Sequence, residues 1–226
     1  MSSLPCSLCA FVSSSIGKKL IVALTGLVLV LFLAGHLAGN LLIFKGPADF
    51  NEYAHFLHHM MHGAGVWIAR LVLLSCLVLH VWFTILLTRE NRAARQSRYA
   101  CDATVQASKS SKIMIWSGLT ILAFIIFHIL HYTVRTDAEL AALGEVSPWQ
   151  MVIVGFSNPL VSLFYIVSMT LLCSHLSHGV ASIFQTLGLR TQKTESAIAL
   201  LAKVYALVIY LGFISIPIAI LCGFGS

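Results

Sequence analysis

Five long apolar segments dominate this 226-residue chain and restrict the folds open to it. They cover residues 20–44, 65–88, 113–134, 160–184 and 198–222. Each is long enough to cross a hydrocarbon core about 30 Å thick, which takes ~20 helical residues. Because lipid offers no hydrogen bonds to the backbone, such segments fold as helices. We therefore predict an all-α integral membrane bundle of five transmembrane helices, formed by residues 1–226 as a single domain.

The composition excludes most soluble classes of protein. Apolar residues make up 58% of the chain and charged residues only 10%, whereas a soluble domain has roughly 25% charged residues. The six cysteines are scattered, which is not the pattern of a disulfide framework. A disordered protein, a disulfide scaffold and a nucleic-acid-binding protein are therefore disfavoured. Gly46–Pro47, Ser147–Pro148 and Asn158–Pro159 predict breaks between the segments.

Lys and Arg are distributed unequally between the two sides of the predicted bundle. One side carries ten of them: Lys18, Lys19, Arg89, Arg92, Arg95, Arg98, Lys109, Lys112, Arg190 and Lys193. The other side carries only Lys45 and Arg135. Because basic residues concentrate in cytoplasmic loops, we predict a cytoplasmic N-terminus and a C-terminus outside.

Four of the ten histidines lie inside separate predicted spans. They are His36, His80, His128 and His175, in the first four spans in order. Ionisable side chains in lipid are costly, usually face the bundle interior, and often mark a functional site. A rise of 1.5 Å per residue puts His36 and His128 about 24 and 22 Å from the cytoplasmic ends of their spans. His80 and His175, on spans that run the other way, lie about 12 and 14 Å from that end.

The four histidines therefore fall at two depths, roughly 10 Å apart. Two imidazoles from different helices at one depth are what a haem with two axial histidines requires, and an apolar bundle provides a dry pocket. Gly35, Gly39 and Gly179 lie close to these histidines and leave room for a flat ring. We predict two haems, with His36 and His128 holding the outer one and His80 and His175 the inner one. The alternative is that these histidines only form interhelical hydrogen bonds.

Further polar residues accompany the four histidines. His131 and His178 follow His128 and His175 by three residues, and each is either an interfacial group near a haem propionate or a replacement ligand. Arg70, one turn into the second span, needs an anion, and a propionate of the outer haem would serve.

A second histidine group, His55, His58, His59 and His62, precedes the second span in the sequence HFLHHMMH. The spacings of three and four residues can place two imidazoles on one helical face. Three interpretations remain: the end of an interfacial amphipathic helix, a proton donor at a quinone site, or a metal site.

Several short motifs occur in the order found in one known family. They are IGKK at 16–19, TGL at 25–27, GHLAGN at 35–40, FNEYAHFLHH at 50–59, WIAR at 67–70, LHVW at 79–82, NRAAR at 91–95, FHILHYT at 127–133 and HLSHG followed by FQTLG within 175–188. On these residues the chain resembles the cytochrome b membrane-anchor subunit of succinate:quinone oxidoreductase (succinate dehydrogenase or fumarate reductase). The resemblance is to the class in which one five-helix chain holds two haem b groups. It covers nearly the whole chain up to the fifth span.

The resemblance implies that the axial ligands of the haem irons are His36, His80, His128 and His175, one from each of the first four helices. It implies a flavoprotein subunit that interconverts succinate and fumarate, and an iron–sulfur subunit that exchanges electrons with this chain. The electron partner in the membrane would be a quinone, with menaquinone expected for members that carry two haems. Glu52, with His55, is the candidate for proton transfer to the quinone, and Lys19 joins Arg70, His131 and His178 as candidate contacts to propionates or quinone.

The resemblance also implies a place in the respiratory chain and the tricarboxylic acid cycle, in a bacterial cytoplasmic membrane, and leaves open whether the complexes associate as dimers or trimers. Other functions stay open from the sequence alone. The chain could be the cytochrome b anchor of a hydrogenase or formate dehydrogenase, although the order of motifs argues against this. It could also be a transporter without haem whose histidines line a metal or proton path, or an anchor that has lost its haems.

Overall fold

A computed structural model describes residues 7–94 and 114–225, and throughout these residues it contains helices and their connections but no strand. Within this part of the chain, five helical segments are long and apolar enough to cross a membrane. They are α2 (Ser15–Asn40) with the 3₁₀ turn η1 (Leu41–Lys45), α4 (Ala64–Ala93), α6 (Met114–His128) with the π-helical η3 (Ile129–Val134), α9 (Pro159–Thr186) and α10 (Glu195–Leu221). The predicted all-α fold and its five long helices are confirmed.

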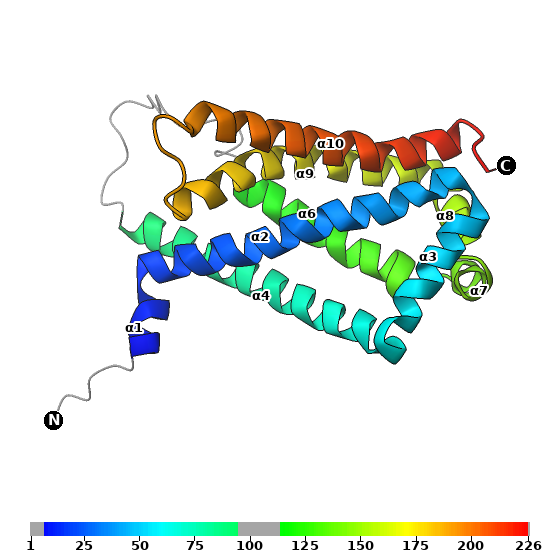
Figure 1. Cartoon of the computed structure of the whole chain (residues 1–226), viewed down its shortest axis with the longest axis horizontal. Coiled ribbons are helices and arrows are strands. Elements are labelled where there is room, and N and C mark those ends of the chain that lie inside the picture. The colour runs from blue at the N-terminus through cyan, green and yellow to red at the C-terminus, as the bar shows by residue number, and fades with distance from the viewer. Residues whose placement is uncertain (1–6, 95–113, 226) are drawn as a thin grey trace.

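Short helices occupy parts of the chain outside the five spans. The sequence predicted no helical element there, except that an interfacial helix end was one interpretation of the histidine group. The short helices are α1 (Ser7–Ser13), α3 (Pro47–His59), the 3₁₀ turn η2 (Met60–Gly63), α7 (Ala138–Val146) and α8 (Pro148–Ser157). Figure 1 shows α3, α7 and α8 gathered at the end of the bundle where the C-terminus lies. The hydropathy pattern did not reveal them because each is too short to span a membrane.

The predicted chain breaks coincide with helix starts. Pro47, Pro148 and Pro159 each occupy the first turn of a helix, where a missing N–H costs nothing. The Ser147 hydroxyl accepts a hydrogen bond from the Gln150 backbone N–H at 3.2 Å, and the Asn158 side chain accepts one from Leu160 N–H at 3.0 Å. These side chains replace backbone partners that a helix start lacks, so the sequence determines where α8 and α9 begin.

The long helices pack unequally against one another. α9 and α10 run side by side, α2 lies against α4, α9 and α10, and α6 lies against α9 (Figure 1). A cluster of buried apolar side chains joins α2, α6, α9 and α10, including Leu37, Phe124, Leu172 and Ala206. The described part of α4 contributes no side chain to that cluster. Accordingly α4, like α6, buries fewer of its apolar side chains than α2, α9 and α10 do.

The start of α2 and the end of α10 lie at opposite ends of the bundle, as an odd number of spans requires (Figure 1). The start of α2, the end of α4 and the α9–α10 connection share the end opposite the C-terminus. These segments carry six of the ten basic residues on which the predicted orientation depends, and Arg95, Arg98, Lys109 and Lys112 lie outside the described residues. Which end faces the cytoplasm remains a prediction.

An ion pair joins α2 and α4 at this basic end. The Lys18 amine donates to the Glu90 carboxylate, and the side chain of Lys18 is only 10% exposed. Replacing Glu90 with glutamine leaves a buried ammonium group without a counter-charge. We expect Glu90→Gln to lower the free energy of unfolding by about 1–2 kcal/mol, measured as a lower thermal midpoint in detergent from tryptophan fluorescence.

The matched control is Glu195→Gln, which breaks the Arg190–Glu195 pair of 2.6 Å. In that pair both partners are more exposed, at 29% and 59%, so its contribution to stability is small. Equal shifts in the thermal midpoint for the two variants would contradict the view that burial of Lys18 makes the α2–α4 pair important.

Candidate functional site

His36 and His128 meet near the end of the bundle where the C-terminus lies. His36 lies on α2 and His128 is the last residue of α6 before the π-helical turn. Their ring centroids are 5.8 Å apart, and the two ring planes are nearly perpendicular at 84°. We call these two residues the outer pair.

Aromatic rings surround the outer pair. Phe32 stacks on His36 with a centroid distance of 5.1 Å, and Phe124 stacks on His128 at 5.8 Å. Phe213 reaches His36 from α10, also at 5.8 Å. Such apolar surroundings exclude water and disfavour charged imidazolium, so both rings are suited to act as neutral ligands.

Tyr165 on α9 contacts two histidines with one hydroxyl group, His128 at the end of α6 and His131 in η3. The hydroxyl oxygen lies 3.2 Å from His128 Nδ1 and 3.1 Å from His131 Nδ1. The His131 ring makes tilted contacts with the rings of Phe127, at a centroid distance of 5.4 Å, and Tyr132, at 4.2 Å. The structure thus brings the His128 ring to the His36 ring, whereas His131 contacts Tyr165.

His80 on α4 faces the first half of α2. Its Nδ1 lies 3.1 Å from the Val22 carbonyl oxygen and 3.4 Å from the Thr25 hydroxyl. A Cβ atom added at Gly26 would lie 3.2 Å from His80 Cε1, so the imidazole lies tightly against this glycine. A carbonyl oxygen only accepts hydrogen bonds, so His80 carries its proton on Nδ1, and Nε2 is then the nitrogen able to bind a metal.

His175 lies on α9, and we call His80 and His175 the inner pair. The Ser117 hydroxyl of α6 is 3.4 Å from His175 Nδ1. A Cβ atom at Gly118 would be 3.6 Å from His175 Cε1. His178 lies three residues further along α9.

The contacts of the two pairs define two levels in the bundle. At the inner level, Thr25 of α2 contacts His80 and Ser117 of α6 contacts His175. At the outer level, His36 of α2 faces His128 of α6. On each helix the interval between the levels is eleven residues, or about 16 Å of helix. This exceeds the roughly 10 Å expected from the sequence, because that calculation assumed that all spans begin at one depth. The two levels are separated by about half of a 30 Å hydrocarbon core.

The outer pair fits a metal held between two imidazoles. With a metal–nitrogen bond of about 2 Å on each side and each ring centre about 1 Å beyond its nitrogen, the centroids would be roughly 6 Å apart. The observed distance is 5.8 Å. A Cβ atom at Gly35 or at Gly179 would meet no other atom within 4 Å, so each position leaves space beside a paired histidine. The same expectation for Gly39 is wrong, because the Tyr53 ring fills that position, with Cε1 2.5 Å from where a Cβ atom would lie. The spacing of the outer pair therefore fits the two axial ligands of a haem b.

In the described part of the chain, no three His, Cys, Asp or Glu residues gather to form a larger metal site. A haem needs only two protein ligands, so this finding concerns other kinds of metal centre. The histidines of α3 and η2 are among the residues that form no such group. Two of them, His55 and His59, stack with ring centroids 3.8 Å apart. His58 and His59 instead direct Nδ1 to the carbonyl oxygens of Ala54 and His55.

The remaining candidate residues lie away from the two pairs or on the surface. Glu52 and His55 are exposed on α3, three residues apart. Arg70 is exposed on α4, and its guanidinium lies over the ring of Trp67 at 4.9 Å. Lys19 is exposed, whereas the neighbouring Lys18 is buried and paired. The structure thus gives Arg70 an aromatic contact, where the sequence led us to expect an anion.

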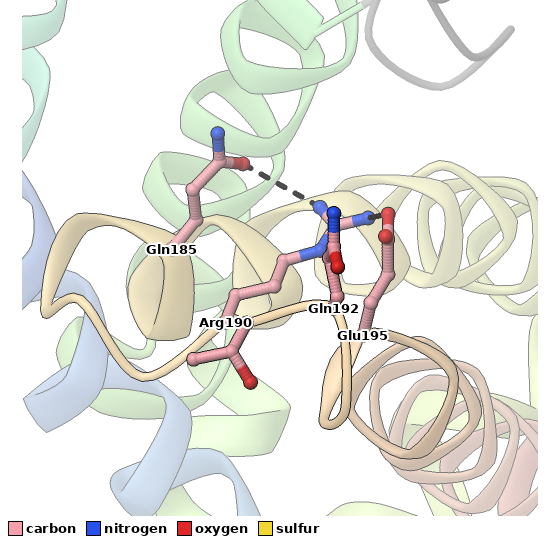
Figure 2. A pocket seen from close by; sticks show the side chains of 5 residues that line it. Gln185, Arg190, Gln192 and Glu195 are labelled. Carbon is pink, nitrogen blue, oxygen red and sulfur yellow. Dashed lines mark hydrogen bonds and ion pairs between the residues drawn. The ribbon is translucent and has the colours of Figure 1, made fainter.

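Figure 2 shows a polar pocket at the α9–α10 connection, lined by Gln185, Arg190, Thr191, Gln192 and Glu195. Arg190 donates to Glu195 at 2.6 Å and to Gln185 at 3.4 Å, so its charge is already balanced. This pocket is open at the basic end of the bundle and involves neither pair of histidines.

Sequence reasoning missed the tyrosines near the outer pair. No sequence pattern indicated a role for Tyr165, because its partners His131 and His128 lie 34 and 37 residues away along the chain. Tyr132 adjoins His131, and its buried hydroxyl has no hydrogen-bond partner among the described residues. FHILHYT does contain Tyr132, but the motif does not reveal which polar groups face one another.

Comparison of the chain with protein-family models, with curated proteins and with solved structures finds no match.

Proposed function

We propose that this chain is the dihaem cytochrome b subunit of a succinate:quinone oxidoreductase. In this role it anchors a flavoprotein subunit and an iron–sulfur subunit to a bacterial cytoplasmic membrane. It transfers electrons between the iron–sulfur subunit and a membrane quinone, which we propose is menaquinone. The dicarboxylate chemistry takes place on the flavoprotein subunit.

The observation that carries the proposal is the presence of two histidine pairs, from four helices, at two levels. The outer pair matches the centroid spacing of two axial imidazoles, at 5.8 Å. The inner pair lies about 16 Å away along α2 and α6. Stacking two redox centres in this way would carry electrons through the apolar core, which a single centre near one surface would not do.

The protein's contribution is to hold and orient the ligands. The Val22 carbonyl keeps the His80 proton on Nδ1. The Tyr165 hydroxyl contacts Nδ1 of His128, and the Ser117 hydroxyl contacts Nδ1 of His175. Haem iron, when bound, supplies a one-electron carrier at each level. Apolar side chains exclude water around the outer pair, which limits unwanted proton and oxygen chemistry.

The proposed orientation places the inner pair nearer the cytoplasm and the outer pair nearer the outside. The basic start of α2 and the basic α9–α10 connection then face the cytoplasm, where the two soluble subunits would bind. Glu52 and His55, exposed on α3 at the opposite end, are the candidates for proton exchange with quinone at the outer surface.

A difference spectrum tests the haem proposal directly. We expect the purified chain, reduced with dithionite and compared with its oxidised form, to show low-spin b-type bands with two haems per polypeptide. Extraction of the pigment as its pyridine complex gives the haem count. A chain that folds in the membrane but shows no such bands would favour the transporter without haem.

A further inference from the structure

Three polar side chains meet where α9 packs against the end of α6 and η3, and one of them, His128, belongs to the outer pair. The Tyr165 hydroxyl oxygen lies 3.2 Å from His128 Nδ1 and 3.1 Å from His131 Nδ1. Tyr165 is only 6% exposed, and its ring packs edge-on against Phe124 at 5.0 Å and Phe156 at 4.8 Å. The aromatic packing holds the ring in place, so the hydroxyl has a fixed position between the two histidines.

The hydrogen-bonding capacities of these groups allow few arrangements. A phenol has one O–H to donate and lone pairs that accept, and a neutral imidazole has one donor nitrogen and one acceptor nitrogen. An imidazole that binds iron through Nε2 carries its proton on Nδ1. If His128 is the ligand, its Nδ1–H must donate to the Tyr165 oxygen. The Tyr165 O–H is then directed to His131 Nδ1, which accepts.

We propose that Tyr165 is the positioning residue of the outer haem, an inference that rests on the proposed function. It accepts a hydrogen bond from His128 Nδ1–H and donates one to His131 Nδ1. The first bond fixes the tautomer and ring orientation of His128 and strengthens its donation to iron. The second bond holds the hydroxyl in the accepting orientation, which is the role we assign to His131.

This arrangement is particular to the outer pair. At the inner pair, the atom facing His80 Nδ1 at 3.1 Å is the Val22 carbonyl oxygen, which belongs to the backbone of α2. The group facing His175 Nδ1 is the Ser117 hydroxyl of α6, at 3.4 Å. A change at Tyr165 therefore alters one haem and leaves the other with its own partners.

Tyr165→Phe removes the hydroxyl and keeps the packed ring. Without its acceptor, His128 donates less strongly to ferric iron, so the midpoint potential of the outer haem rises. In a redox titration of the purified chain followed by absorbance, we expect two haems, one of which shifts to higher potential. At a fixed ambient potential, its ratio of reduced to oxidised form increases by up to about tenfold, equivalent to about 59 mV for one electron.

Tyr132→Phe is the matched control. It is the same substitution in the same neighbourhood, with the Tyr132 and Tyr165 ring centroids 6.2 Å apart. The Tyr132 hydroxyl has no hydrogen-bond partner in the described structure, so its removal breaks no bond. We expect the potentials of both haems to stay unchanged in this variant.

His131→Phe is the second variant, because it leaves Tyr165 and His128 in place. The Tyr165 hydroxyl loses its acceptor and becomes a poorer acceptor itself, since hydrogen bonds in a chain strengthen one another. We expect a smaller rise in the potential of the same haem. Loss of one haem in Tyr165→Phe, with both retained in Tyr132→Phe, would also support the positioning role.

Three results would overturn the inference: unchanged potentials in Tyr165→Phe, equal shifts in the two tyrosine variants, or a lower potential in His131→Phe. Absence of haem from the unsubstituted chain is a different result, because it would reject the proposed function itself. The two failures are therefore distinguishable in one set of preparations.

Discussion

His128→Ala is expected to leave one haem per chain where the unsubstituted protein binds two. The substitution removes one imidazole of the outer pair, and an iron with a single axial histidine is held poorly in a site built for two. The inner pair, about 16 Å away, keeps its own contacts to α2 and α6. The measurement is haem content per polypeptide, with the difference spectrum identifying the haem that remains.

His131→Ala provides the control for this experiment, because it removes an imidazole only three residues away. His131 contacts Tyr165 and Tyr132 in the structure, whereas the ring facing His36 belongs to His128. We expect His131→Ala to retain two haems. If it lost a haem while His128→Ala kept both, the ligand assignment within FHILH would be wrong.

Gly26→Leu is expected to remove the inner haem without changing any histidine. A Cβ atom at this position would lie 3.2 Å from His80 Cε1 and 3.7 Å from Ile183 Cδ1, so a leucine side chain has no room. It would push His80 away from Val22 and from His175. We expect the haem content to fall from two to one, with the outer haem retained and its spectrum unchanged.

Ala34→Leu on the same helix is the control for steric effects. Ala34 is exposed, so a larger apolar side chain there has space in the lipid. We expect the variant to fold and to bind two haems. Loss of both haems in Gly26→Leu would indicate that α2 itself was disrupted, and retention of both would exclude the close approach of His80 to α2 as a requirement for the inner site.

Most of the helical architecture was predictable from the sequence. Span length and hydropathy are local properties, and lipid permits few alternatives to a helix, so the five long segments agree with α2, α4, α6, α9 and α10 to within a few residues at most ends. The short helices α7 and α8 were not predictable in this way. They depend on caps and on packing across the end of the bundle, as when Asn51 of α3 accepts from Trp149 N–H at 2.9 Å.

The four paired histidines were also recognisable, because ionisable side chains within apolar segments are rare. Choosing between His128 and His131 was harder. They lie three residues apart and so share one side of a helix, and the π-helical turn that begins after His128 alters the orientation of everything that follows. A hydropathy pattern contains no information about such a change.

The sequence by itself determined the number of spans, the starts of several helices and which histidines lie in the apolar core, since each depends on neighbouring residues. Only the tertiary structure decided which groups the imidazoles face: Tyr165 for His128, and Val22 and Gly26 for His80. These partners lie 37 to 58 residues away along the chain. Their approach depends on how the helices pack, which is a property of the whole bundle and not of any one segment.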